Sequence, residues 1–216
     1  MQFNCPFFIK IFVLLVISPV VWSRPVSYPG GWTTMLMNNS DRNSVHIHYS
    51  PTARYSVGYR GEYWRDREFF IHALQVNNLV KRWNGPASQA NIYLQSGLGL
   101  AVDDNERYDD QTEAVFFTGL AADWENRRFF VSYQNRYIEA NDLGDFFFQS
   151  ARFGVAPYIG DYGDLHTWFM LDVRHSPESP DNVVITPLVR LLKGVNMIEA
   201  GISDNSDITF NWVRRF

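Results

Sequence analysis

Apolar and polar residues alternate one by one through much of this chain, and this alternation most constrains its fold. In residues 44–50 (SVHIHYS), every second side chain is apolar. The same pattern recurs in residues 54–60, 90–102, 165–174 and 208–216. A period of two places successive side chains on opposite faces, so it predicts β-strands. No helical period of 3.6 and no sequence repeat competes with it, and the chain is predicted to be all-β.

The two faces of these predicted strands differ in composition. One face is rich in Leu, Val, Ile and Phe, whereas the other mixes Gly, Ser, Asn, Gln, His, Arg and Tyr. In a soluble sandwich, a second sheet with a matching apolar face would have to cover the first. A lipid-facing exterior around a polar lumen produces the observed pattern directly. The sequence therefore predicts a closed antiparallel transmembrane β-barrel.

Turn-forming residues divide the alternating segments. Clusters of Gly, Pro, Asn and Asp supply the sharp reversals that short connections need. Eleven clusters imply twelve strands, with ten or eight as alternatives if some clusters are bulges. The clusters are residues 38–43, 51–53, 65–67, 84–88, 103–110, 123–127, 139–145, 161–164, 176–181, 193–194 and 204–206.

Residues 1–23 have the composition of a secretory signal peptide. Lys10 is their one charged residue, an apolar run follows it, and small residues precede a plausible cleavage point before Arg24. The alternative is a retained membrane anchor, but the apolar run is shorter than the roughly 20 residues a spanning helix needs, and Pro19 interrupts it. We expect a signal peptide at 1–23 and a barrel domain at 24–216.

Charge and cysteine content exclude several classes of function. The chain has 19 Lys and Arg against 23 Asp and Glu, a net charge of -4, which argues against a nucleic-acid partner. The single cysteine, Cys5, lies in the predicted signal peptide. Disulfide frameworks and multi-thiolate metal sites are therefore not expected. No glycine-rich phosphate loop is present, and no cofactor is expected.

The chain is rich in aromatic residues, with 17 Phe, 11 Tyr and 7 Trp. Many of them lie beside the predicted turns, as Trp64, Trp83 and Trp124 do. Transmembrane barrels carry such residues as girdles at both membrane interfaces, where one ring meets both lipid and water. Core aromatics of a soluble β domain are the alternative.

The last strand ends on an aromatic residue. Ile208, Phe210, Trp212 and Phe216 share one face, and Arg214 is the exception on that face. This resembles the C-terminal signal of bacterial outer-membrane β-barrel proteins, which the barrel-assembly machinery reads. The resemblance implies a Gram-negative outer-membrane location, with membrane lipids, lipopolysaccharide and that machinery as partners. It identifies no subfamily.

Charged residues on the predicted polar face suggest two possible interiors. They could pair across the lumen and plug it, or an unpaired arginine ladder could line a pore for anionic solutes. Both interiors fit the leading expectation, a structural or small-solute channel role without covalent chemistry. The charged residues are Arg54, Arg60, Glu113, Arg136, Arg152, Asp172, Arg174, Arg190, Glu199 and Arg215.

A hydrolase is the first alternative function. His48 and Ser50 lie two apart on one strand face, so a base and a nucleophile could approach each other. The pair resembles the His-x-Ser element of outer-membrane lipid A deacylases, although it lies early in this chain and late in that family. Glu62 is the one suggested carboxylate to orient the histidine.

A metal-responsive envelope protein is the second alternative. His46 and His48 share the polar face of one strand, and Met35 and Met37 share one face of the preceding strand. Imidazole and thioether groups suit copper or zinc. The alternative is that these four are ordinary lumen residues.

Overall fold

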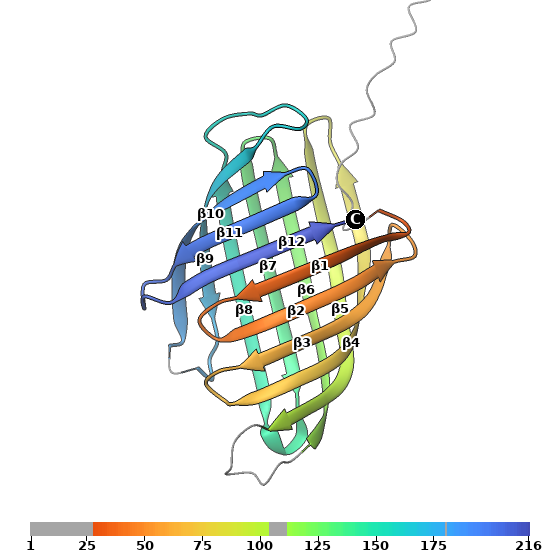
Figure 1. Ribbon diagram of the computed structural model, residues 1–216, viewed down its shortest axis with the longest axis vertical. Coiled ribbons are helices and arrows are strands. Elements are labelled where there is room, and N and C mark those ends of the chain that lie inside the picture. The colour runs from red at the N-terminus through yellow and green to blue at the C-terminus, as the bar shows by residue number, and fades with distance from the viewer. Residues whose placement is uncertain (1–27, 104–111, 180) are drawn as a thin grey trace, which may run out of the picture.

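The computed structural model describes residues 28–103, 112–179 and 181–216, in which twelve antiparallel strands form a closed barrel (Figure 1). Each strand pairs with its neighbours in sequence, and β1 pairs with β12 to close the wall. The strands are β1 (Gly31–Asn38), β2 (Arg42–Ser50), β3 (Tyr55–Trp64), β4 (Phe69–Asn84), β5 (Ser88–Asp103), β6 (Thr112–Asn126), β7 (Phe129–Glu139), β8 (Asp145–Val155), β9 (His166–His175), β10 (Val183–Lys193), β11 (Asn196–Ile202) and β12 (Ile208–Arg215). The predicted all-β class and the count of twelve strands are confirmed.

A single short 3-10 helix, η1 (Asn141–Leu143), interrupts the strands in the part of the chain that the structure describes. No helix among these residues is long and apolar enough to span a membrane. The predicted signal peptide, residues 1–23, lies outside the described residues, as does most of the predicted turn at 103–110.

Most predicted turns coincide with connections between strands, but the structure differs from the prediction in two places. β6 continues through Asp123 to Asn126, so the connection to β7 is only Arg127–Arg128. Arg54 was expected on a strand facing the lumen, but it lies in the exposed connection between β2 and β3. Its backbone carbonyl accepts a hydrogen bond from the Leu79 amide at 2.7 Å. Arg54 is therefore a rim residue.

The outer surface of the barrel is apolar. Along β4, Leu74 is 67 % exposed, whereas its neighbour Gln75 is 1 % exposed and points into the lumen. Leu98 on β5 and Leu120 on β6 repeat this outward placement. In a protein that water surrounds, so many exposed leucines would be costly to hydrate, but a lipid environment accommodates them.

The inside of the barrel has an apolar half and a polar half. We call the end where β1 begins and β12 ends the terminal rim, and the opposite end the far rim. An apolar cluster fills the lumen near the far rim between β3 and β8. Its buried members are Trp64, Phe69, Ile71, Ala73, Ala101, Val115, Phe117, Ile138, Ala140, Phe146 and Phe148. The remainder of the interior is lined mainly by polar side chains.

A glycine on β3 allows this strand to approach β2 closely in the wall of the barrel. Gly58 on β3 pairs with His48 on β2. A Cβ at Gly58 would overlap the carbonyl oxygen of Ile47 and the Cα of His48. Glycine at this position therefore lets the backbones of β2 and β3 approach each other closely.

Candidate functional site

Glu62 is the centre of a cluster of charges inside the barrel. It lies on β3 with its side chain 1 % exposed. Arg60 Nε donates to Glu62 Oε1 at 2.8 Å, and Arg136 Nη2 donates to Oε2 at 2.6 Å. Arg42 Nε lies 3.5 Å from Oε1. Arg136 comes from β7, and three strands of the wall separate β7 from β3, so its ion pair crosses the lumen.

The arginines of this cluster pack against the apolar cluster. The Arg42 guanidinium lies 4.2 Å from the Phe148 ring centroid and 4.9 Å from that of Trp64. The Arg136 guanidinium lies 4.7 Å from Phe148 and 5.0 Å from Phe117. A cation over an aromatic face is attracted by the ring quadrupole. These contacts join the charged and the apolar clusters into one body, which we call the plug: the apolar cluster with Arg42, Arg60, Glu62 and Arg136.

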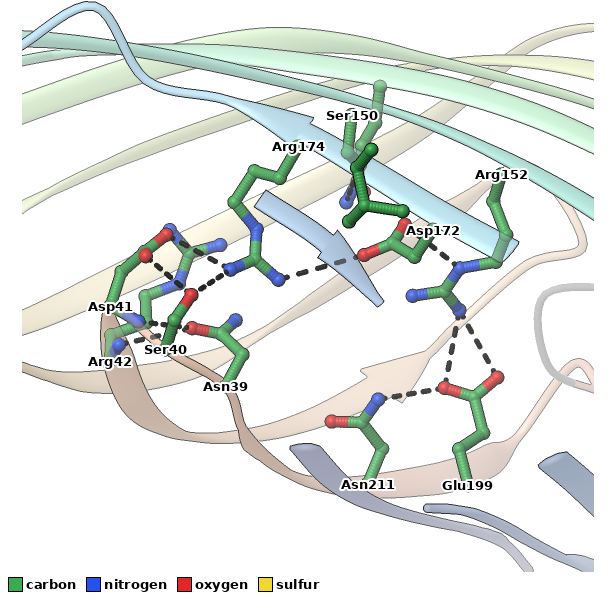
Figure 2. Close-up of polar contacts among 12 residues, drawn as sticks. Asn39, Ser40, Asp41, Arg42, Ser150, Arg152, Asp172, Arg174, Glu199 and Asn211 are labelled. Carbon is green, nitrogen blue, oxygen red and sulfur yellow. Dashed lines mark hydrogen bonds and ion pairs between the residues drawn. The ribbon is translucent and has the colours of Figure 1, made fainter. Parts of the chain in front are cut away.

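A second network connects strands β8 to β12 (Figure 2). Arg152 Nε donates to Asp172 at 3.1 Å, and its Nη1 donates to Glu199 at 3.1 Å. Glu199 also accepts hydrogen bonds from Arg190 Nε at 2.6 Å and from the Asn211 amide at 2.7 Å. Each of these carboxylates is almost completely buried, so the pairs replace the hydration that the charges lose.

Arg174 ties the far rim to this network (Figure 2). Its Nη1 donates to Ser40 Oγ at 2.7 Å and to Asp41 Oδ2 at 3.2 Å, both in the connection between β1 and β2. Its Nη2 lies 3.6 Å from Asp172. The connection Asn39–Asp41 is thereby held against β9 across the barrel.

The two networks differ in charge balance. Arg152, Arg174 and Arg190 meet three carboxylates, those of Asp41, Asp172 and Glu199. In the plug, by contrast, three arginines share the one carboxylate of Glu62. Arg42 Nη1 and Arg136 Nε and Nη1 find no hydrogen-bond acceptor within the described ranges. The plug therefore carries a surplus of buried positive charge.

Two cavities lie on either side of the plug. One, of about 310 Å³, lies at the far rim and is lined by Trp64, Arg67 and Phe148, among others. Arg67 covers the Phe146 ring there at 3.9 Å, and partial burial lowers the pKa of its guanidinium. The other cavity, of about 420 Å³, occupies the polar half of the lumen. Phe148 lines both cavities and therefore stands between them.

The larger cavity brings together the four residues suggested as metal ligands. Met35, Met37, His46 and His48 all line it, and Met197 of β11 adds a third thioether. The sequence interpretation missed Met197, because the sequence does not give the register that places Met197 on β11 level with Met35 on β1, across β12. The register supplies this fact, since Val213 pairs with both Met35 and Met197.

The histidine pair is buried and poorly hydrogen-bonded. His46 is 5 % exposed and His48 is 1 % exposed, and their ring centroids are 4.7 Å apart. His46 Nε2 and both ring nitrogens of His48 have no hydrogen-bond partner among the residues described. Buried polar atoms are usually paired, so three such nitrogens in one place need an explanation.

His48 and Ser50 lie on the same face of β2 but are not hydrogen-bonded to each other. Both side chains are buried on the lumen face of β2. Since neither His48 nitrogen is hydrogen-bonded within the described chain, the histidine does not accept a bond from Ser50. Glu62, the suggested orienting carboxylate, is bound to arginines instead.

The remaining predicted lumen residues take several positions. Arg60, Arg152, Asp172, Arg174, Arg190 and Glu199 belong to the two networks, and Arg215 lines the larger cavity at the terminal rim. Arg42 and Asp41 were missed because they fall within a predicted turn cluster. The alternation does identify Arg42 as inward, since it has the same parity as His46.

The proposed assembly residues lie at the seam of the barrel. Phe210 and Phe216 are 46 % and 64 % exposed on the outer surface, and Trp212 is partly exposed. Phe216 exchanges two backbone hydrogen bonds with Trp32, at 2.6 and 2.9 Å, so it extends the pairing of β12 with β1.

Comparisons with known proteins add little to this geometry. No family model and no curated protein matches the chain. Among solved structures, it is similar to OmpTdeltaL8, a loop L8 deletion mutant of OmpT, which is an outer membrane protein of Vibrio cholerae. The identity is 12 %, the match covers 87 % of this chain and 97 % of that one, and the TM-score is 0.29. A likeness this low carries no argument about the activity.

Proposed function

We propose that this protein is an outer-membrane β-barrel whose lumen is closed at rest, so that it has a structural role and is not an open pore. The observation that carries the proposal is the plug, which stands between the two cavities and includes the Glu62–Arg136 ion pair across the lumen at 2.6 Å. We expect buried pairs and packed aromatic rings of this kind to block a continuous aqueous path through the lumen.

The outer-membrane location rests on the wall of the barrel and on its last strand. A closed barrel satisfies every backbone polar group of its wall internally, as a lipid environment demands. The exposed leucines of β4 to β6 suit contact with acyl chains. Phe216 at the seam fits the terminal signal of this class of protein. Membrane lipids, lipopolysaccharide and the barrel-assembly machinery are the partners that this location implies.

A small-solute channel selective for anions is the second candidate. The surplus positive charge of the plug favours it, because the ion pairs of Arg42, Arg60 and Arg136 among the described residues all go to Glu62. If the plug moves, these guanidinium groups line the path between the two cavities. An arginine-lined constriction attracts anions and repels cations.

Planar bilayer conductance distinguishes the two candidates. We expect the unaltered protein to give no steady conductance steps. Phe148→Ala removes the ring that lines both cavities, and we expect it to produce steps with a reversal potential that favours chloride over potassium. Phe153→Ala is the matched control, since Phe153 lies on the same strand but faces outward.

Each conductance result supports one of the two candidate functions. Steady steps from the unaltered protein contradict the closed lumen and favour the channel. Silence from the unaltered protein with steps from Phe148→Ala supports a lumen that the plug closes at rest. Silence from both, with both barrels folded, contradicts the role given to the Phe148 ring and argues against the channel.

A further inference from the structure

The larger cavity contains a group of soft, neutral metal ligands. His46 and His48 project from β2, and Met35 lies directly opposite His46 on β1. Paired residues in antiparallel strands have Cα atoms about 4.5–5.5 Å apart, so the Met35 thioether and the His46 imidazole reach the same space. Met37 and Met197 line the same cavity.

The two histidine rings converge. Side chains two apart on a strand leave the backbone about 7 Å from each other. The rings of His46 and His48 nevertheless lie with their centroids 4.7 Å apart and tilted by 41°. Both rings are more than nine-tenths buried, and three of their nitrogens lack partners in the described part of the protein. A metal ion bound between the rings would accept one lone pair from each neutral imidazole.

The donor set indicates which metal suits it. No group of three His, Cys, Asp or Glu side chains that could hold a metal ion occurs within the described residues, so the usual ligand set for zinc is absent there. Imidazole with thioether is a soft set that favours monovalent copper. Arg60 lies opposite His46 in the strand register, and its charge repels a monovalent ion less strongly than a divalent one.

The competing ligand for this cavity is an anion held by the arginines. The guanidinium of Arg60 is already bound to Glu62 and to Gln75 at 2.9 Å. The unpaired nitrogens of Arg42 and Arg136 belong to guanidinium groups that stack on the Phe148 ring, at 4.2 and 4.7 Å from its centroid. An anion at the plug would also leave both ring nitrogens of His48 without a partner. The histidine and methionine group therefore favours a soft cation.

We propose that His46, His48 and Met35 bind one monovalent copper ion inside the barrel, with Met37 and Met197 as the neighbouring thioethers. The site requires only the folded barrel. A conducting barrel would overturn the proposed closed lumen and leave the copper site intact.

Competition with a chromophoric chelator of monovalent copper tests the proposal. The full barrel, folded in detergent, is titrated against the copper–chelator complex under ascorbate, and Ag⁺ serves as a redox-inert second probe. We expect one ion per barrel. X-ray absorption of the copper-loaded barrel should show both nitrogen and sulfur neighbours.

Two sets of variants locate the ion. His46→Gln with His48→Gln should abolish the binding, and Met35→Leu, which keeps the side-chain volume, should weaken it by more than about tenfold. His72→Gln and Met170→Leu are the matched controls. His72 faces outward and contacts the Tyr59 hydroxyl at 2.7 Å, whereas Met170 packs against Gly154. Heat-dependent gel mobility confirms that each variant folds.

Several results would overturn the site. They are the absence of competition by the unaltered barrel, equal binding by Met35→Leu, and loss of binding in the control variants. The cavity would be assigned to an anion if the barrel bound phosphate or sulfate and not copper, and if Arg136→Met abolished that anion binding.

Discussion

Replacing Glu62 by glutamine tests the ion-pair cluster in the lumen with little change in side-chain size. The carboxylate is the shared partner of Arg42, Arg60 and Arg136, and its side chain is 1 % exposed. The substitution keeps an oxygen acceptor but removes the negative charge. Three guanidinium groups then remain buried beside a neutral amide.

The magnitude follows from the burial of these groups. Removing one partner from a buried ion pair costs about 3–5 kcal/mol, because the remaining charge is left uncompensated. Stacking of Arg42 and Arg136 on aromatic rings is the same with Glu or Gln at position 62, so it cancels from the difference. The amide oxygen of glutamine still accepts a hydrogen bond, which places the loss at the lower end of this range. We therefore expect Glu62→Gln to lower the free energy of unfolding by about 3 kcal/mol.

Urea unfolding of the barrel in lipid vesicles, followed by tryptophan fluorescence, measures this change as a lower midpoint at unchanged slope. Glu139→Gln is the control, because Glu139 is an exposed glutamate at the end of β7. It should change the free energy of unfolding by less than about 0.5 kcal/mol. Adding Arg136→Met to Glu62→Gln should cost less than the two single changes summed. Equal midpoints for Glu62→Gln and Glu139→Gln would refute the reasoning.

Three further predictions concern the rim, the wall and the seam. Arg174→Met removes the hydrogen bonds to the connection between β1 and β2, which contains Asp41. Hydrogen exchange of the backbone amides in that connection should speed up by more than about tenfold. Unchanged exchange would show that other contacts hold the connection. Gly58→Ala places a methyl group against the Ile47 carbonyl and should cost about 1–3 kcal/mol in urea unfolding, an expectation that an unshifted midpoint would refute. Phe216→Ala should reduce the heat-modifiable fraction recovered from the outer membrane without lowering the amount synthesised, and full recovery would argue against an assembly role.

Much of the wall could be predicted from the sequence because its physical signal is local. A period of two needs only neighbouring residues, so Leu74 and Gln75 reveal their faces without any tertiary information. Turn residues likewise act within four positions, and they yielded the correct number of strands. Arg54 was misplaced for the same reason. Arg54 continues the alternating pattern of residues 54–60, but β3 begins only at Tyr55, so Arg54 lies in the connection before the strand.

The lumen could be predicted only in outline. Parity showed that Arg60 and Arg152 face inward, but the choice of partner depends on distance across the barrel. Arg136 meets Glu62 over 74 residues of sequence, and Arg174 meets Asp41 over 133. No short-range pattern encodes such pairings. Which inward arginine meets which carboxylate therefore depends on the register of the closed wall and not on any local pattern.

The central claim is that alternate residues of each strand face lipid and a lumen closed to bulk water. Spin labels at residues 74 to 77 of β4 test it most directly, since the chain from residue 24 onward has no native cysteine to interfere. In reconstituted vesicles we predict high collision rates with oxygen at 74 and 76, low rates at 75 and 77, and little access of a water-soluble nickel reagent at any of the four. Uniform oxygen access along β4, or free access of the nickel reagent at 75 and 77, would contradict the account.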